Sequence, residues 1–459
     1  MIPGPAWGEP VTLALPIRGR PVLGRISALD AAAFVIPAMS FLEVTIVGRL
    51  IVTEILLLVA LPWLWRFSRP RIPSWFLLLW AVWLISQIVT DIVVGSRFSD
   101  WARGWAGIVF TLTNFVAILA LVSTPQRARL FGAGLAVGGM LGLLFVPHPA
   151  AASDPWKWGV ALPAGFLLAA AVSGRAGDRW RWLTVSAFAA LGVLNVVLGY
   201  RSLAGIAVLV AGYLALAALF RPRKVGHEHS PRRAGAALIL LALTGIVVLA
   251  VYSWTASQGL LGPEQQRRYS GQGGAFGVVL GGRPEALVST EAILDSPLLG
   301  HGSWARDPAY AKLLAERQEE FGYEVNPIYV GTDLIPTHSF LLGAWVWAGV
   351  LGALFWIAVA VPVVWLLGNL YSARLELAPL LVFAALLLLW DIAFSPYGFG
   401  TRITAPYELA LSLLGLRLLR ETQARPWSSG PGGEPHHAQV PQPVDGHRPP
   451  AVAQGIESS

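Results

Sequence analysis

Long apolar runs alternate with short polar segments along most of the chain, and this pattern predicts an all-α polytopic membrane protein. A helix needs roughly 20 mainly apolar residues to cross the hydrocarbon layer, and several runs reach that length. Asp30 and Pro37 interrupt the first run, and we expect the long tenth run to tilt or break near Pro362. The twelve predicted spans are residues 26–42, 47–66, 75–95, 103–123, 129–146, 158–173, 181–199, 202–220, 234–254, 339–367, 377–395 and 403–420.

The basic residues of the connecting segments predict the orientation. Alternate connections are rich in Arg and Lys, whereas the intervening ones carry one or two positive charges each. Because basic loops stay in the cytoplasm, both termini are expected there, in a protein of the cytoplasmic (inner) membrane. The residues that carry this prediction are Arg66, Arg69, Arg71, Arg127, Arg129, Arg175, Arg179, Arg181, Arg221, Arg223, Lys224, Arg232 and Arg233.

The same pattern divides the chain into four parts. Residues 1–254 hold spans one to nine, and residues 338–423 hold spans ten to twelve. Between them, residues 255–337 form a large extracytoplasmic loop, in which helices are expected over 284–294 and 312–323. Residues 424–459 are rich in Pro, Gly, Ser and Gln, which predicts a disordered cytoplasmic tail.

Composition narrows the possible functions. Only 13% of the residues are charged, against about 25% in an average soluble domain, and 20 Trp suit a bilayer protein. The net charge of +7 lies in the short connections, so it reflects membrane topology, and no nucleic-acid partner is expected. The absence of Cys excludes disulfides, thiolate metal sites and Cys nucleophiles.

Ionisable side chains at the outward ends of the spans are candidates for function, because charges beside a membrane are costly. Arg201 lies in a very short connection between the seventh and eighth spans, where a fixed guanidinium suits a bidentate contact with phosphate. The alternative is an Arg that snorkels to lipid headgroups. Arg283 precedes a predicted helix, whose free N–H groups can help to bind an anion; the alternative is a solvated loop Arg.

Three further residues lie at the same level. His338 is at the outward mouth of the tenth span, and imidazole is the usual group that takes a proton from a hydroxyl. The alternative is a His that caps a helix start. Lys157 lies at the outward edge of the sixth span, and Asp391 near the outward end of the eleventh, with Arg402 just beyond. Each can contact a charged headgroup or orient another site residue, or serve in the aromatic belt or an intramembrane ion pair.

Several chemistries have no motif in this sequence. It lacks Asp-x-Asp, a P-loop, His-Glu-x-x-His and Gly-x-Ser-x-Gly. The outward face therefore offers Arg, Lys and His, without an expected metal site or other cofactor. Such a set suits reactions of a phosphorylated lipid, because basic groups stabilise a departing diphosphate while one base activates a hydroxyl.

Three fragments in the second half of the chain resemble the superfamily of O-antigen ligases and polysaccharide polymerases of bacterial envelopes. Residues 200–205 read Tyr-Arg-Ser-Leu-Ala-Gly, similar to a Ser-Arg-Gly-like signature at the start of the eighth span. Residues 282–285 read Gly-Arg-Pro-Glu and precede Pro-Leu-Leu-Gly-His-Gly at 297–302, close to the family's Gly-Arg and Pro-Leu-Leu-Gly-x-Gly. Residues 337–341 and 347–352 resemble His-Asn-x-x-Leu followed by Gly-x-x-Gly, with Ser339 in place of Asn.

This resemblance implies a membrane glycosyltransferase of the GT-C-like kind. Its donor is expected to be a glycan on a polyprenyl (undecaprenyl) diphosphate, and its acceptor a hydroxyl of a lipid A-core or similar molecule. In the family, a His of the periplasmic loop is proposed to activate the acceptor and outward-facing Arg residues to bind the diphosphate. These roles fall on His338, and on Arg201 and Arg283, with Lys157 and Asp391 as further substrate contacts. The expected partners are the donor, a lipid or glycan acceptor and membrane lipids.

Other functions stay open. A polymerase of the same superfamily differs only in its acceptor, which is a second lipid-linked glycan. A lipid-glycan flippase is expected to carry ionisable groups in mid-membrane and an internal repeat. A non-catalytic assembly scaffold is expected to tolerate replacement of His338. For the ligase, we expect metal-independent transfer with inversion on the outer side of the membrane.

Overall fold

The fold consists almost entirely of helices. The structure, a computed structural model, describes residues 27–45, 48–146, 149–175, 177–219, 231–271, 281–323, 325, 331–371, 373, 375–398 and 400–423. The predicted tail at 424–459 and the basic residues Arg221, Arg223 and Lys224 lie outside these residues. A helix overlaps each of the twelve predicted spans. These helices are α1 (Ala28–Ala38), α2 (Val52–Ser68), α3 (Ser74–Val94), α4 (Phe98–Leu121), α5 (Pro125–Phe145), α6 (Ala161–Val172), α7 (Asp178–Val197), α8 (Arg201–Leu219), α9 (Pro231–Ser257), α14 (Phe340–Leu370), α15 (Ala378–Phe394) and α16 (Thr401–Gln423).

The lengths and apolar composition of these helices are those of a membrane protein. Seven of the described helices are long and apolar enough to cross a bilayer, namely α3, α4, α5, α7, α8, α9 and α14. Shorter apolar helices cover Ala28–Phe41, Trp156–Val172 and Ala378–Phe394. Twelve crossings therefore stay a prediction.

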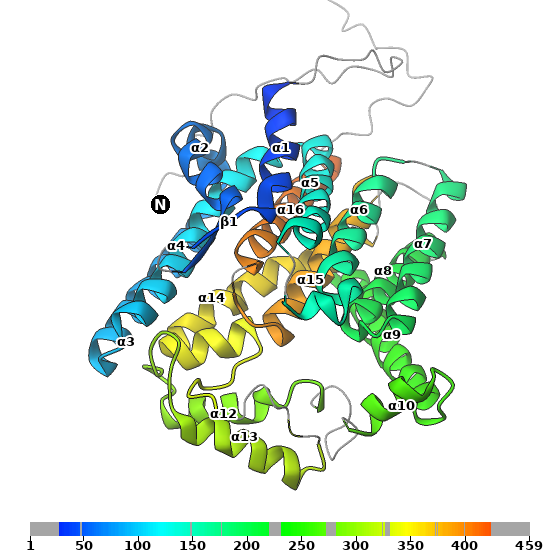
Figure 1. The fold of residues 1–459 in the computed structure, drawn as a ribbon. Helices are drawn as coiled ribbons and strands as arrows, with labels where there is room; N and C mark the ends of the chain where they lie inside the picture. Colours follow the sequence, from blue (N-terminus) through cyan, green and yellow to red (C-terminus); the bar gives the residue numbers. More distant parts are fainter. Residues whose placement is uncertain are drawn as a thin grey trace, which may run out of the picture.

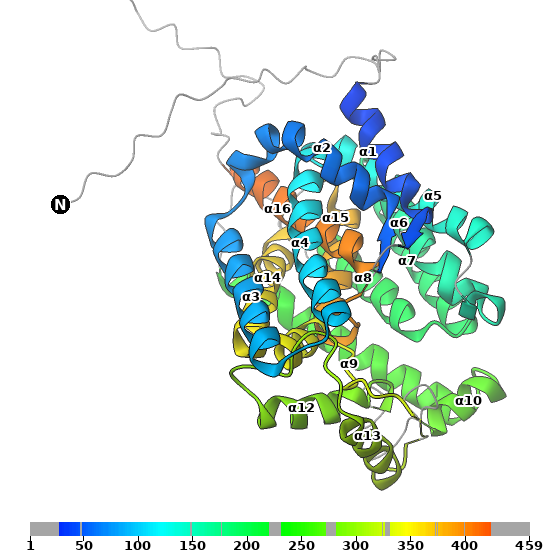
Figure 2. The ribbon, with the colours of Figure 1, turned by 60° about the vertical axis from the view of Figure 1, so that its left-hand side comes forward.

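Three shorter helices gather at one end of the bundle. They are α10 (Pro263–Ser270), α12 (Glu285–Asp295) and α13 (Pro308–Glu320), and Figures 1 and 2 show them together beyond the ends of α9 and α14. We call this the α12/α13 end. The predicted helix at 284–294 is present as α12. The one predicted at 312–323 starts earlier, because Pro308 occupies its first turn and the Asp307 side chain accepts from Ala309 N at 2.9 Å.

The chain also contains a short hairpin that the apolar pattern did not predict. Strand β1 (Glu43–Thr45) pairs antiparallel with β2 (Arg49–Ile51), and Val44 is opposite Leu50. Helix α2 therefore begins at Val52, five residues after the predicted start of the second span.

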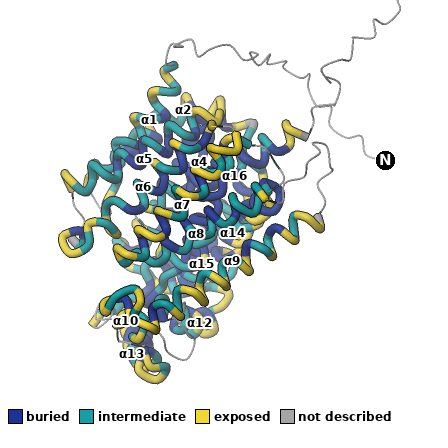
Figure 3. The backbone as a smooth tube through the Cα atoms, turned by 90° about the vertical axis from the view of Figure 1, so that its right-hand side faces the viewer, coloured by how far each residue is buried: buried dark blue, intermediate teal, exposed yellow. Residues whose placement is uncertain are grey.

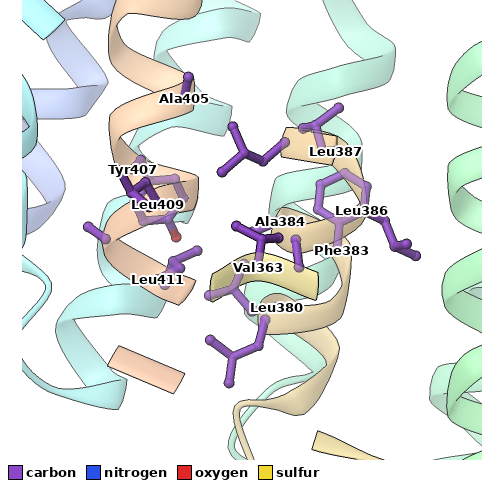
Figure 4. Packing of buried hydrophobic residues seen from close by; sticks show 14 of the residues in the cluster. Val363, Leu380, Phe383, Ala384, Leu386, Leu387, Ala405, Tyr407, Leu409 and Leu411 are labelled. Atoms are coloured by element: carbon purple, nitrogen blue, oxygen red, sulfur yellow. The ribbon is translucent and has the colours of Figure 1, made fainter. Parts of the chain in front are cut away.

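The interior of the bundle is built around α15 and α16. Buried side chains of both helices pack against each other, with Phe383 and Tyr407 among the largest (Figure 4). The Tyr407 hydroxyl donates to the Ala128 carbonyl at 2.7 Å, so its polar atom is satisfied. Figure 3 shows exposed positions on the outside of the bundle, where α9 presents Ile246 (63% exposed) and Val247 (60% exposed). Apolar exposure of this kind suits contact with lipid.

Helix α14 is broken at Gly349 and continues through Pro362, so a break near Pro362 is wrong, whereas a tilt of this helix stays a prediction. Gly349 has φ 66° and ψ −166°, a conformation almost restricted to glycine. The segment 297–302 lies against this break: His301 N donates to the Val346 carbonyl at 2.7 Å, and Val350 N donates to the Pro297 carbonyl at 3.0 Å. The bond that would join Val350 N to Val346 in a continuous helix is thus replaced by two bonds to a distant segment.

Candidate anion-binding site

The turn between α7 and α8 positions Arg201 at the α12/α13 end. Gly199 has φ 81°, which lets the backbone reverse, and Tyr200 N donates to the Asn195 carbonyl at 2.8 Å. Helix α8 begins at Arg201, whose Nη1 donates to the Tyr252 hydroxyl of α9 at 3.2 Å. The guanidinium is therefore oriented by a neutral partner and keeps its charge available.

Arg283 connects the start of α12 to the end of α15. Its Nε donates to the Phe394 carbonyl at 2.8 Å, and its Nη1 to the Gly282 carbonyl at 2.7 Å. Asp391, one turn before Phe394, interacts with Ser395 and with the charge of Arg283. The structure therefore brings the predicted residues Arg283 and Asp391 into one neighbourhood.

His338 lies at the entrance of α14, directly before the cap of that helix. The Ser339 hydroxyl accepts from Leu342 N at 3.0 Å and donates to the Ile392 carbonyl at 2.7 Å, which fixes the backbone beside His338. Burial, together with the charges of Arg283 and Lys157, lowers the pKa of His338 to about 3. The imidazole is therefore neutral at physiological pH, and one ring nitrogen can accept a proton.

Glu285 is a neighbour of His338 to which the sequence analysis gave no role. Its Oε1 lies 3.7 Å from His338 Nδ1, and the residue is 4% exposed. It occupies the first turn of α12. In the sequence, Glu285 directly follows Gly-Arg-Pro at the start of a predicted helix. A carboxylate in a first helical turn is stabilised by the helix dipole, so this position alone does not indicate a function.

Lys157 lies on the single turn of π-helix, Trp156–Val160, that precedes α6. Its Nζ is 5.0 Å from the centroid of the Trp158 ring, and its backbone N–H donates to Asp154 Oδ1 at 2.9 Å. The negative charge of Asp154 and the positive charges of Arg283, Arg268 and Arg201 all act on its ammonium group. Lys157 thus interacts electrostatically with Arg201, Arg283 and His338, although the four residues come from separate elements.

This cluster of like charges favours an anionic ligand. Positive groups held together in a partly buried place repel one another, and a bound anion relieves that repulsion. Arginine offers a planar pair of donors that matches a phosphate group. No group of three His, Asp or Glu side chains that could hold a metal ion is found in the part of the chain that the structure describes.

Arg402, which the sequence placed near this level, belongs to a different arrangement. Its Nη2 lies 2.9 Å from Glu54 Oε2 and donates to the Arg49 carbonyl at 2.8 Å. Glu54 is fully buried, and its side chain also accepts from Ile51 N. Arg402 therefore ties α16 to α2 and its hairpin, which is a structural role.

Comparison with known proteins gives no family assignment. No family model matches the chain, and no curated protein matches it.

Proposed function

We propose that this chain is an O-antigen ligase-like glycosyltransferase. It moves a glycan from a polyprenyl (undecaprenyl) diphosphate to an acceptor hydroxyl, such as that of a lipid A-core, on the outer side of the cytoplasmic membrane. One observation carries the proposal: Lys157 and Arg283 act on a neutral His338, and Arg201 acts on Lys157, at one end of a bundle of apolar helices.

The chemistry follows from the two kinds of side chain present. The acceptor oxygen attacks the anomeric carbon of the first sugar, and the bond from that carbon to the diphosphate oxygen breaks. The proton of the hydroxyl passes to His338, and the electron pair leaves with the diphosphate. Lys157, Arg201 and Arg283 stabilise the negative charge that develops on the leaving group. A single displacement of this kind inverts the anomeric centre.

The low pKa of His338 fits this role once the donor is bound. In the free protein, burial and two nearby cations lower the pKa of the imidazole to about 3, so it is neutral but weakly basic. A bound diphosphate offsets those cations and thereby raises the pKa, which makes His338 a stronger base when substrate is present. Glu285, 3.7 Å from Nδ1, can orient the ring and stabilise the imidazolium that forms.

The arrangement of the resembling fragments supports the same proposal. Arg201, Arg283 and His338, one from each fragment, interact with a shared neighbour, Lys157, or with each other. Segment 297–302 is hydrogen-bonded to the break in α14 at Gly349, which joins two further parts of the resemblance. In this proposal, the α12/α13 end faces the periplasm or exterior, twelve helices cross the membrane, and both termini are cytoplasmic.

The test is transfer by the purified protein in nanodiscs, supplied with a polyprenyl-diphosphate glycan and candidate acceptors. Lys157→Gln, Arg201→Gln and Arg283→Gln should each lower product formation by about 10- to 100-fold, because a charged hydrogen bond contributes about 1.5–3 kcal/mol. Lys312→Gln is the matched control, since this α13 lysine is 80% exposed and pairs with Glu316 at 3.5 Å.

Three outcomes would contradict the proposal or change its substrate. Equal activity of the control and the three site variants would remove the cation cluster from the reaction. Activity that a chelator abolishes and a divalent ion restores would contradict metal-independent transfer. A ladder of products from repeat units alone would assign the chain to the polymerases, whose acceptor is a second lipid-linked glycan.

A further inference from the structure

Helix α10 lies over the turn that presents Arg201. It follows α9 after a short connection, with Gly262 (φ 92°) before it and Pro263 in its first turn (Figures 1 and 2). Gln265 faces inward and is 6% exposed. A Cβ atom placed on Gly199 would lie 3.4 Å from Gln265 Nε2 and 3.1 Å from Arg268 Nη1, so α10 is in close contact with this turn.

Arg268 of α10 lies beside the turn that presents Arg201. Its Nη1 is the closest of the atoms that a Cβ on Gly199 would meet, two residues before Arg201, and its charge acts on Lys157 together with those of Arg201 and Arg283. Its Nε pairs with Glu264 Oε1 at 2.8 Å, with the two side chains 41% and 57% exposed. An exposed pair of this kind contributes little to stability, so Arg268 can exchange Glu264 for another anion at small cost.

We propose that Arg268 is a further diphosphate-binding residue, which α10 places against the turn that presents Arg201. This inference rests on the proposed function, since it assigns one more contact to the same ligand. Neither the spacing of the apolar runs nor the resembling fragments pointed to this helix. The ligand chemistry is a diphosphate, whether it is free or carried on a lipid.

The neighbouring residue Arg267 supplies an internal control. It belongs to the same helix and has the same charge, but its side chain is 78% exposed and its Nη2 lies 3.9 Å from Glu264 Oε2. Removing either arginine changes the net charge of the protein equally. Of the two, only Arg268 lies against the turn at Gly199 and acts on Lys157 with its charge.

The experiment measures binding of inorganic pyrophosphate and of geranyl diphosphate to the full-length protein in detergent by isothermal titration calorimetry. Arg268→Gln should weaken binding of both probes by about tenfold, as expected for loss of a charge-assisted contact. Arg267→Gln should change it less than about twofold, because exposed charges are screened. Glu264→Gln should tighten binding, since it releases Arg268 from its competing partner. A weaker effect on pyrophosphate than on geranyl diphosphate would assign the contact to the lipid-linked form.

Two results separate this inference from the proposed function. Equal affinities of Arg268→Gln and Arg267→Gln, with Arg283→Gln weakened, would overturn the role of α10 and leave the diphosphate site standing. Unchanged binding in Arg283→Gln as well would overturn the proposed diphosphate site itself. Thermal unfolding of each variant in the same detergent ensures that only folded protein is compared.

Discussion

Two polar clusters at the α12/α13 end differ in the groups that surround their central charge. Around Asp91 of α3, neutral donors surround one carboxylate: Ser303 N at 2.6 Å, the Ser303 hydroxyl at 2.7 Å, the Ser96 hydroxyl at 2.7 Å and Trp105 Nε1 at 2.7 Å. Around Lys157, by contrast, three arginines and a single carboxylate, that of Asp154, act on the ammonium group. The first arrangement satisfies its charge internally, whereas the second leaves a positive potential for a ligand to neutralise.

The charge of Arg306, at the same end, is also satisfied by groups of the protein itself. Arg306 lies 2.9 Å from Asp100 of α4 and 2.9 Å from Asp333, so one guanidinium bridges two carboxylates. These pairs raise the pKa of Arg306 and lower that of Asp333. The loop before α13 is thus tied to the bundle by ion pairs of opposite charge. The number of charges in a cluster therefore does not indicate a binding site. An excess of one sign that the protein itself does not neutralise does.

The largest expected effect on stability comes from breaking the compensated cluster. Asp91→Ala leaves the Ser303 and Trp105 donors without their acceptor, and each buried donor left unsatisfied costs roughly 1–3 kcal/mol. The temperature of thermal unfolding in detergent should therefore fall, while the protein that remains folded still binds pyrophosphate with wild-type affinity. Asp178→Ala is the control, since that side chain is 85% exposed. If Asp91→Ala kept wild-type stability but lost pyrophosphate binding, the Asp91 cluster would belong to the binding site, which would contradict this account.

A smaller effect is expected from pH. The pKa of His338 is lowered from 6.5 to about 3 in the folded protein, so the unfolded chain takes up a proton first as the pH falls. His338 therefore destabilises the fold progressively from about pH 6.5 toward pH 3, by about 2 kcal/mol at pH 5.

Thermal unfolding at pH 8 and pH 5 checks this, with His338→Gln beside wild type. Wild type should lose more stability than the variant over this interval, and bound pyrophosphate should reduce the difference because it raises the pKa of His338. An equal loss in both proteins would show that His338 is not held neutral by its surroundings.

Much of the helical framework could be predicted from the sequence, because each apolar run is a local signal. The break in α14 could not, since Pro362 is a visible helix breaker whereas Gly349 bends only because segment 297–302 supplies its hydrogen bonds. Helix α10 was missed although Pro263 and the Glu264–Arg268 spacing are helix signals. The hairpin at 43–51 was missed because its second strand continues into an apolar run.

The candidate site shows the same division. Arg201, His338, Lys157 and Asp391 could be named because each stands at the end of a predicted span, and Arg283 because it precedes a predicted helix of the loop. The roles assigned to them stay predictions. The sequence could not show that Glu285 faces His338, or that Arg283 bonds to the end of α15, because both contacts depend on how distant helices pack. The sequence also could not show that Arg402 forms an ion pair with Glu54 and is therefore not one of the charges of the site.

The most direct test compares wild type with His338→Ala in one nanodisc preparation, measuring both glycan transfer and donor binding. We predict that transfer falls by at least about 100-fold, as for loss of a general base, while donor affinity changes only about two- to threefold. Glu285→Gln should give a smaller loss of turnover, again with donor binding retained. Unchanged turnover in His338→Ala, or no transfer by wild type with any acceptor, would contradict the assignment of this cluster as the centre of a glycan transferase.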